Sequence, residues 1–402
     1  MENETTLIEV KHKQQNKHSI LTNQKHLKYQ DKINLGAFYT PQKYIDIVWE
    51  KIYPFLTKKS LVLDSSCGYG NFFNYNIDCQ KLANDIDTIA IKQTKLKFPN
   101  IKIFNKNALL NVNRNMFNIS IKNSLIIIGN PPYNDTTSII RNDIKKDNFK
   151  IDDDIKTRDY GMSFLLSYSK LDADIICVLH PLSYLIKKAN FNLLKKFSNK
   201  YKLIDSVIID SATFKETSKG ISFPIVIALY KKDNLGMDYN YIQNYRFKTL
   251  SGHNFALKDF DFIPNYINKY PLKNVIPTEN DILFWTMRDI NALKRNRTFV
   301  NKFGYNTIII NKNKLDYYIY VDVFKQFSHL IPYYFGNLDV FINNNLFQKY
   351  KKYFFCEIIT RHPLLKKYIT YDKNISIQKA KEKITEYFKF LMNKHYVYWK
   401  NW

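Results

Sequence analysis

Glycine, proline and cysteine are all scarce in this chain, whose 402 residues include 10 glycines, 12 prolines and 4 cysteines. The four cysteines have no paired spacing, which argues against a zinc cluster or a disulfide framework; they are Cys67, Cys79, Cys177 and Cys356. No apolar run reaches the roughly 18 residues of a membrane-spanning helix, and residues 1–30 contain no apolar signal region. We therefore expect an intracellular, cytoplasmic protein with reduced thiols and no membrane contact.

Acidic residues are outnumbered by basic ones, with 36 Asp and Glu against 61 Lys and Arg and a net charge of +25. Such an excess favours a polyanionic partner, and nucleic acid is the first candidate. The chain is also crowded with Lys, Asn, Ile, Tyr and Phe, the residue types that an AT-rich coding sequence supplies in excess. Composition alone therefore leaves the partner open.

The pattern of apolar residues divides the chain into three parts. Residues 1–33 are polar and basic, and we expect a flexible arm there. In residues 34–233, short apolar runs alternate with helix-length stretches, which predicts an α/β domain with a mostly parallel, doubly wound, Rossmann-like sheet. A linker is predicted around 231–238. Residues 234–402 lose the alternation and are expected to form a separate α+β domain that ends in a helix from Ile377 to about His395.

Seven apolar runs are predicted to form the strands of this sheet: Leu61–Asp64, Lys81–Asp85, Ile101–Phe104, Leu125–Gly129, Asp174–His180, Leu203–Ile209 and Pro224–Tyr230. A helix is expected ahead of them, with Thr40 as its N-cap and Pro41 as its first residue. Its apolar positions recur at helical spacing and are Ile45, Val48, Trp49, Ile52 and Leu56.

Small and polar residues follow the first three strands. Asp64 ends the first strand, and Gly68 and Gly70 turn the chain in a way that lets backbone approach a nucleoside closely. Asp85 ends the next strand, where a carboxylate can accept hydrogen bonds from ribose hydroxyls. Asn107 follows the third strand and is placed to contact an adenine ring. Asp85 as a solvated carboxylate and Asn107 as a turn residue are the structural alternatives.

The segment SLIIIGNPPYND, residues 124–135, ends an aliphatic strand in a stiff turn. The Asn130 side-chain carbonyl and the Pro131 backbone carbonyl can point at one spot, where a primary amine would donate both its hydrogens. Pro131 and Pro132 fix the carbonyl directions, and Tyr133 can lay its ring on a planar, amine-bearing group. The alternative is a purely structural turn.

These segments, in this order, resemble the S-adenosylmethionine-dependent amino-methyltransferases, most closely the gamma class of adenine-specific DNA methyltransferases. GAFYTP (36–41) looks like the first cofactor segment, LDSSCGYGNFF (63–73) like the glycine loop and NPPY (130–133) like the catalytic tetrad. The resemblance covers residues 36–232. It implies that S-adenosylmethionine is held by Phe38, Tyr39, Thr40, Pro41, Asp64, Cys67, Gly68, Gly70, Asp85, Ile86, Asn107, Ala108 and Asn130.

The chain departs from the gamma-class pattern at three places. Asn107 stands where the family usually has an Asp that accepts from the cofactor's adenine amino group, so weaker cofactor binding is expected. Ser65 and Ser66 replace the family's usual Pro-Ala, a tolerable change. The third is ATFKETSKGISFPIVIALYKK (212–232), which resembles the family's last hairpin: both Phe214 and Phe223 are candidates to stack on the target base alongside Tyr133, and the spacing favours Phe214.

The resemblance implies a site-specific DNA adenine methyltransferase of a restriction-modification or related DNA-marking system. Double-stranded DNA is then the partner, a cognate restriction endonuclease a further one, and the transfer needs no metal. The C-terminal domain would read the target sequence while basic residues grip phosphates, for which the candidates are Arg288, Lys294, Arg295 and Arg297. An ordinary solvated basic loop is the alternative for these four. The alternative functions are an RNA amino-methyltransferase with the same NPPY site and a catalytically silent DNA-binding subunit.

Overall fold

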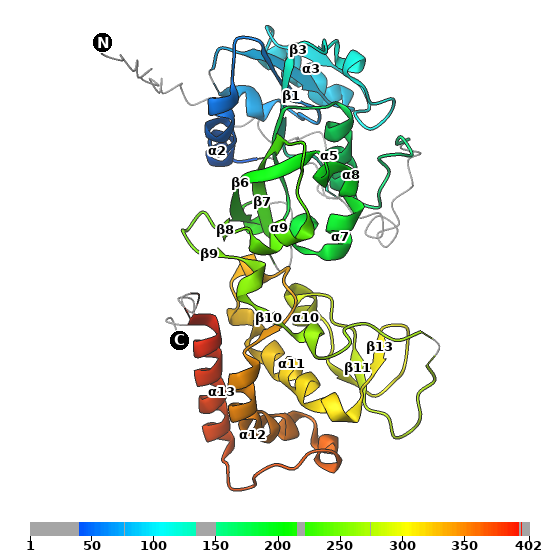
Figure 1. The fold of residues 1–402 in the computed structure, drawn as a ribbon, viewed down its shortest axis with the longest axis vertical. Helices are drawn as coiled ribbons and strands as arrows, with labels where there is room; N and C mark the ends of the chain where they lie inside the picture. Colours follow the sequence, from blue (N-terminus) through cyan, green and yellow to red (C-terminus); the bar gives the residue numbers. More distant parts are fainter. Residues whose placement is uncertain are drawn as a thin grey trace, which may run out of the picture.

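The computed structural model describes residues 40–75, 77–133, 150–214, 222–273, 275–393 and 395. The predicted arm and two predicted cofactor residues, Phe38 and Tyr39, lie outside this range. Figure 1 shows two bodies along the long axis, one built around the large sheet and one around the helices of the C-terminal part.

The large sheet contains all seven predicted strands: β1 (Ser60–Asp64), β2 (Gln80–Asn84), β3 (Lys102–Phe104), β4 (Ser124–Gly129), β5 (Ile175–Pro181), β6 (Tyr201–Asp210) and β7 (Pro224–Lys232). Their order is β3-β2-β1-β4-β5-β7-β6. Neighbouring pairs from β3 to β5 are parallel, while β7 runs antiparallel to both β5 and β6. The prediction of a doubly wound, Rossmann-like methyltransferase sheet is confirmed.

The central position of β4 explains its composition. It lies between β1 and β5, and residues 125–129 are all buried. A strand whose two faces are both covered is made of aliphatic and β-branched residues. The flanking helices are α2 (Gln42–Ile52), α3 (Thr88–Lys97), α5 (Tyr160–Lys170), α6 (Ser183–Ile186), α7 (Lys188–Leu193) and α8 (Lys195–Ser198).

The first helix differs from the prediction at both ends. It begins at Gln42 with Pro41 at the N-cap position, one residue later than expected, and Thr40 does not cap it. The Thr40 hydroxyl instead accepts a hydrogen bond from Asn130. The α-helix ends at Ile52 because Pro54 cannot continue it, and a 3-10 turn follows, so Leu56 lies beyond the helix.

The C-terminal part has the expected mixture of helices and short strands. Its helices are α9 (Tyr239–Asn244), α10 (Ile290–Arg295), α11 (Leu315–Phe327), α12 (Asn344–Arg361) and α13 (Ile377–Met392). Its strands are β8 (Phe247–Lys248), β9 (Asn254–Phe255), β10 (Asp261–Phe262), β11 (Leu283–Trp285), β12 (Phe299–Val300), β13 (Thr307–Ile309) and β14 (Phe341–Ile342). The final helix starts at Ile377 as predicted and ends three residues before His395, at Met392.

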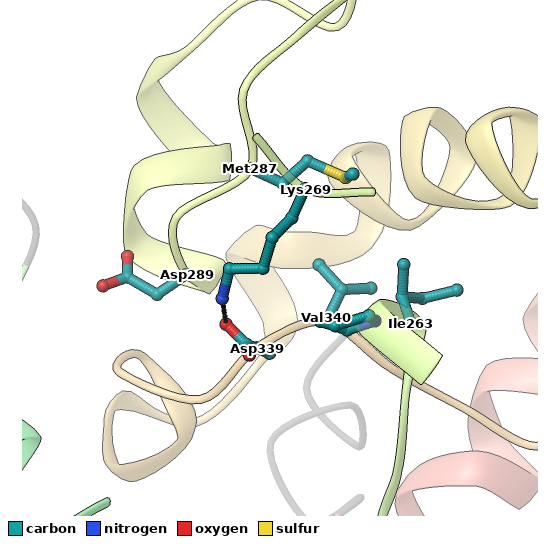
Figure 2. A pocket seen from close by; sticks show the side chains of 7 residues that line it. Ile263, Lys269, Met287, Asp289, Asp339 and Val340 are labelled. Carbon is teal, nitrogen blue, oxygen red and sulfur yellow. Dashed lines mark hydrogen bonds and ion pairs between the residues drawn. The ribbon is translucent and has the colours of Figure 1, made fainter. Parts of the chain in front are cut away.

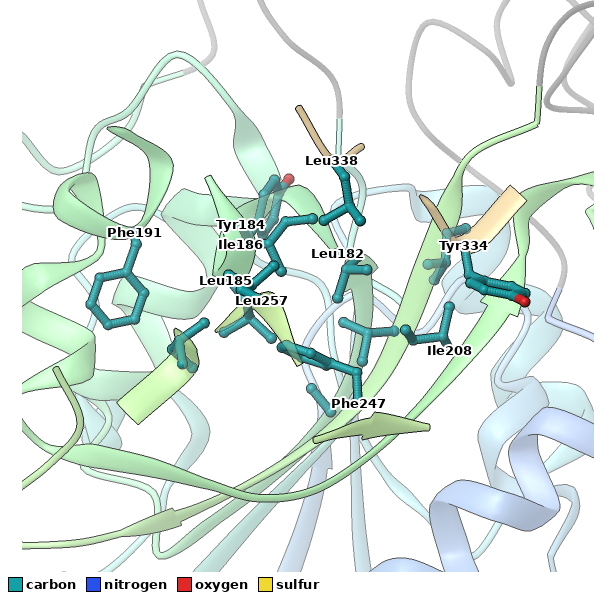
Figure 3. Close-up of a cluster of buried hydrophobic side chains, with 14 of the residues drawn as sticks. Leu182, Tyr184, Leu185, Ile186, Phe191, Ile208, Phe247, Leu257, Tyr334 and Leu338 are labelled. Atoms are coloured by element: carbon teal, nitrogen blue, oxygen red, sulfur yellow. The ribbon is translucent and has the colours of Figure 1, made fainter. Parts of the chain in front are cut away.

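The two bodies share a continuous apolar core. Figure 3 shows Phe247, Leu257, Tyr334 and Leu338 from the C-terminal part beside Leu182, Leu185 and Ile208 from the sheet side. The predicted linker is packed as well, since Met237 is buried and its amide donates to the Ser198 carbonyl at 2.7 Å. The division of the chain at residue 233 stays a prediction.

Candidate functional site at the carboxyl ends of the central strands

The NPPY turn leaves β4 directly beside the end of β1. Gly129 has a φ of 141°, and a Cβ atom added there would lie 2.8 Å from Oδ1 of Asp64. Asp64 is 1 % exposed, and burial raises the pKa of its carboxyl group to about 8, although the Ser66 backbone N–H opposes this shift. A buried acid therefore lies beside Gly129, the last residue of β4, and the missing side chain of Gly129 leaves room for it.

The side-chain amide of Asn130 is oriented by a hydrogen bond from its nitrogen. Its Nδ2 donates to Oγ1 of Thr40 at 3.2 Å. Its Oδ1 is buried and has no hydrogen-bond partner within the part of the chain that the structure describes. A buried acceptor left unpaired costs about 1–3 kcal/mol. This oxygen is consequently available to a donor that comes from outside the chain.

Tyr133 is buried beside the first turn of α5. Burial raises the pKa of its phenol, and the Asn130 side chain opposes the shift. A Cβ atom added at Gly161 would lie 2.9 Å from Cβ of Tyr133 and 2.5 Å from the Tyr184 hydroxyl, so only glycine fits between the two tyrosines. Asp159 caps the helix by accepting from the Gly161 amide at 2.9 Å, and it also accepts from the Tyr184 hydroxyl.

Asp159 and Gly161 were missed from the sequence. The available signal was an Asp ahead of an apolar helix, DYGMSFLL (159–166), which is typical of an N-cap. Nothing in the sequence connects that cap with a tyrosine at position 133, because only the fold brings them together.

The glycine loop after β1 is closed by Asp85. Gly68 and Gly70 have φ values of 51° and 70°, in the left-handed region that glycine adopts without strain. Asp85 accepts from the Gly68 amide at 2.7 Å through Oδ2 and from the Asp87 amide at 2.9 Å through Oδ1. Burial raises the pKa of the Asp85 carboxyl group, and these amides oppose the shift. The structure thus brings Asp85 and the glycine loop together.

Other side chains complete this loop. Thr94 of α3 donates to the Gly68 carbonyl at 2.8 Å, and a Cβ atom at Gly70 would lie 2.9 Å from the Thr94 methyl group. Cys67 is buried, and burial raises the pKa of its thiol, which keeps it protonated and unreactive. Asp87 caps α3 by accepting from the amides of Ile89 and Ala90.

Asn84, the last residue of β2, is a third residue that sequence reasoning missed. Its Nδ2 donates to the carbonyls of Ser65 and Lys106 at 2.9 and 3.0 Å, and its Oδ1 accepts from the Lys106 amide at 3.0 Å. One fully buried amide therefore ties together the segments that follow β1 and β3. The signal was a polar residue inside the otherwise apolar end of LAND (82–85).

The remaining predicted cofactor residues lie along the same edge of the sheet. Asn107 accepts from the Leu109 amide at 3.0 Å and donates to the Lys150 carbonyl at 2.7 Å, so its amide stabilises the turn in which it lies. Ala108 is buried, and Ile86 is 53 % exposed. An adenine contact from Asn107 stays a prediction.

The two candidate stacking residues lie at the described ends of the β6–β7 connection. Phe214 is buried, with its ring centroid 6.2 Å from that of Tyr44 on α2. The Tyr44 hydroxyl donates to Oγ1 of Thr213 at 2.9 Å. Phe223 is half-buried, and its amide donates to Oγ of Ser211 at 2.9 Å. Their contact with a base stays a prediction.

The four predicted phosphate contacts surround α10. Arg288, Arg295 and Arg297 are exposed, whereas Lys294 is half-buried, and this burial lowers the pKa of its amine. Three of the four therefore present their charge to solvent.

A small pocket lies in the C-terminal part (Figure 2). It is lined by Ile263, Pro264, Lys269, Met287, Asp289, Asp339 and Val340, and an ion pair joins Lys269 to Asp339. Its volume of about 10 Å³ has room for about one water molecule, too little for a substrate or cofactor. Within the described residues, no group of three or more potential metal ligands occurs, and no helix is long and apolar enough to cross a membrane.

No model of a known protein family matches the chain, and no curated protein matches it in sequence. Among solved structures, it is similar to a modification subunit ascribed to a type I restriction enzyme of Vibrio vulnificus, with 16 % identity, a TM-score of 0.39 and coverage of 54 % of this chain and 47 % of the other. The corresponding values for a type I restriction-modification methyltransferase subunit from Streptococcus thermophilus are 16 %, 0.36, 56 % and 48 %.

A dimethyladenosine transferase from Plasmodium falciparum is also similar, with 14 % identity, a TM-score of 0.32 and coverage of 48 % of this chain and 62 % of the other. The chain thus spans about half of the length of the two restriction-system subunits. On its own strand order, with β7 reversed between β5 and β6, it carries the Rossmann-like fold of S-adenosylmethionine-dependent methyltransferases.

Proposed function

We propose that this chain is a site-specific, adenine-specific DNA methyltransferase that acts in a restriction-modification or related DNA-marking system. The reaction is transfer of the methyl group of S-adenosylmethionine to the exocyclic amine of an adenine turned out of duplex DNA. The observation that supports it most is Oδ1 of Asn130, a buried acceptor without a partner among the described residues, on a turn that two prolines make rigid.

The edge of the sheet offers groups that fit S-adenosylmethionine. Gly68 and Gly70 keep the loop backbone close to a ligand, and Asp85 carries acceptors suited to ribose hydroxyls. Burial raises the pKa of Asp64 to about 8. A cation beside it, such as the cofactor's ammonium group, would lower this pKa and favour the carboxylate. The bound cofactor supplies an electrophilic methyl group on a sulfonium.

The amine is oriented by the NPPY turn. Asn130 Oδ1 accepts a hydrogen bond from the amine, which directs the nitrogen lone pair away from the ring and towards the methyl donor. Because Thr40 fixes the other end of the Asn130 amide, the acceptor needs no reorganisation during the reaction. Tyr133 packs against the base, and its burial keeps its phenol protonated.

Duplex DNA fits the charge of the chain, which is +25. Arg288, Arg295 and Arg297 are exposed and contact phosphates in this proposal, while the half-buried Lys294 supports α10. The proposed partner is a cognate restriction endonuclease, and the methylation would protect the DNA from cleavage by it.

The first test is transfer of labelled methyl from S-adenosylmethionine to unmethylated duplex DNA, with the product nucleosides identified by mass spectrometry. We expect N6-methyldeoxyadenosine from the wild type and none from Asn130→Ala, which should still bind the cofactor. Total RNA is assayed in parallel. Label in RNA but not in DNA would overturn the DNA substrate, and a methylated cytosine would overturn the adenine assignment.

A further inference from the structure

Helix α10 is joined to the large sheet by a buried hydrogen bond. Nδ2 of Asn291 donates to the Ser222 carbonyl at 3.0 Å, and Asn291 is only 5 % exposed. Ser222 directly precedes Phe223, whose amide donates to Oγ of Ser211 at 2.9 Å. The Ser211 amide in turn donates to the Phe223 carbonyl at 3.0 Å, so the two described ends of the β6–β7 connection are pinned together.

The contact has a steric counterpart in Gly336. A Cβ atom added there would lie 2.5 Å from Nδ2 and 2.7 Å from Oδ1 of Asn291. The backbone N–H of Asn291 also donates to the Gly336 carbonyl at 2.9 Å. Gly336 has an ordinary φ of −57°, so the residue at this position is limited by the space that the Asn291 side chain occupies.

A second contact ties the start of α10 to the sheet side. Asp289 caps α10 by accepting from the Ala292 amide at 2.7 Å, and its other oxygen forms an ion pair with Lys187, which lies between α6 and α7. The helix is therefore fixed in position relative to the sheet at two points.

Packing alone does not explain an asparagine at position 291. Its Oδ1 is buried without a partner among the described residues, which costs about 1–3 kcal/mol relative to a satisfied or apolar side chain. The asparagine provides one directional hydrogen bond to the carbonyl of Ser222, the residue before Phe223. At the other described end of the β6–β7 connection, Thr213 accepts a hydrogen bond from Tyr44 of α2. Helix α2 begins two residues after Thr40, which accepts the hydrogen bond from Asn130.

We propose that Asn291 is a positioning residue that holds α10, and with it the exposed cations Arg288, Arg295 and Arg297, in register with the Ser211–Phe223 pair, which lies at the edge of the sheet where β4 also ends. This inference rests on the proposed function, because it concerns how the α10 cations that bind DNA are placed relative to the NPPY turn that receives the base. DNA bound by the cations is then presented to the NPPY turn in one position.

Two variants break the contact in different ways. Asn291→Asp keeps the shape but removes the donor, and Gly336→Ala displaces the side chain without changing Asn291. Asn244→Asp is the matched control, because Nδ2 of Asn244 donates to the Asn240 carbonyl at 2.8 Å on an exposed surface of α9. The unfolding midpoint of each protein is measured first, and rates are expressed per folded molecule.

The proposal predicts a split between binding and turnover. With unmethylated plasmid DNA and labelled S-adenosylmethionine, we expect kcat to fall at least about tenfold in both variants, since small misplacements reduce catalysis strongly. The KM for DNA and the cofactor affinity should stay within about twofold, because the residues proposed to bind DNA and cofactor are intact. A purely structural role would lower the unfolding midpoint and leave kcat per folded molecule unchanged, and that result would overturn the proposal.

Hydrogen exchange separates this proposal from the proposed function. In the unliganded protein, the Ser211 and Phe223 amides should exchange faster in both variants than in the wild type and in Asn244→Asp. Unchanged exchange overturns the positioning role whether or not the wild type methylates DNA. If the wild type leaves DNA unmethylated while these amides respond as expected, the proposed function and the DNA register are overturned. In that case Asn291 would still be the residue that supports the Ser211–Phe223 pair.

Discussion

Nδ2 of Asn130 donates to the Thr40 hydroxyl at 3.2 Å, across 90 positions of the sequence. This bond leaves the Asn130 carbonyl oxygen buried and without a partner in the described chain, at the end of the central strand. Thr40 does not cap α2, because Pro41 occupies the N-cap position. A residue that the sequence assigned to the start of a helix therefore also orients the proposed catalytic amide.

Replacing Thr40 with valine should lower the methyl-transfer rate. Thr40→Val keeps the shape of the side chain but removes the acceptor, so the Asn130 amide loses its fixed orientation and a buried donor is left unpaired. We expect kcat to fall about tenfold, with the unfolding free energy lowered by about 1 kcal/mol. Steady-state kinetics and urea unfolding measure both quantities, and Thr385→Val on α13 is the control. An unchanged kcat would show that the contact does not orient Asn130.

Asp85→Ala should weaken cofactor binding. The substitution removes the acceptor of the Gly68 and Asp87 amides and the proposed ribose partner at once. Hydrogen bonds to a charged group contribute about 1.5–3 kcal/mol each, so a loss of affinity of more than about tenfold is expected in titration calorimetry. Asp87→Ala is the matched control because it removes a neighbouring carboxylate that caps α3 and accepts no bond from the Gly68 amide. Equal cofactor affinity in Asp85→Ala and wild type would rule out the ribose role.

Asp64 should make the unliganded protein less stable as the pH rises. Its pKa is about 8 in the folded chain and about 3.9 in an unfolded one, so the folded state binds the proton more tightly. The stabilising effect of the proton is complete below about pH 4 and is lost between about pH 4 and pH 8. Asp64→Asn does not titrate. The unfolding free energy of the wild type minus that of Asp64→Asn should therefore decrease from pH 5 to pH 8, and a flat difference would contradict the buried acid.

The buried carboxylate of Asp322 should stabilise the C-terminal part at neutral pH. Burial opposes its ionisation, but hydrogen bonds from His362 and Thr298 and the charge of Arg361 outweigh it and hold the pKa below its usual range. A depressed pKa stabilises the fold above about pH 4, and this stabilisation is lost as the pH falls below that value.

Removing this carboxylate should leave the Arg361 guanidinium and the Thr298 hydroxyl without their buried acceptor. Asp322→Ala is expected to lower the unfolding free energy at pH 7 by about 3–5 kcal/mol, as for other broken buried ion pairs. Urea unfolding at pH 7 and pH 3 measures the change, which should shrink at the lower pH. Glu382→Ala on the exposed face of α13 is the control. A similar small effect for both variants would show that the network does not support this part of the fold.

The exposed arginines around α10 should govern the salt dependence of DNA binding. Each phosphate contact that is lost lowers the slope of log affinity against log salt by about 1. Arg295→Ala and Arg297→Ala should each weaken binding to every duplex sequence, with a smaller slope, in fluorescence anisotropy at several salt concentrations. Arg246→Ala is the comparison, because Arg246 pairs with Asp259 near α9. An unaltered slope for either α10 variant would remove that residue from the interface.

The sequence by itself determined the sheet and the order of the site segments. Runs such as LIIIG (125–129) can form a stable strand only where both faces are covered, and the polar residues that follow Asp64, Asp85 and Gly129 lie at one edge because parallel strands end on the same side. The NPPY turn was identifiable because two prolines cannot continue a central strand.

Only the tertiary structure decided how these segments are held. The contacts Thr40–Asn130, Gly161–Tyr133 and Asn291–Ser222 join residues 90, 28 and 69 positions apart, which no local pattern encodes. Asn84 appeared to be an ordinary strand residue until the segments after β1 and β3 came within reach of its amide. Local propensity fixes strands and turns because neighbouring residues decide them, whereas the hydrogen-bond partners of a buried side chain depend on which distant segments the folded sheet brings beside it.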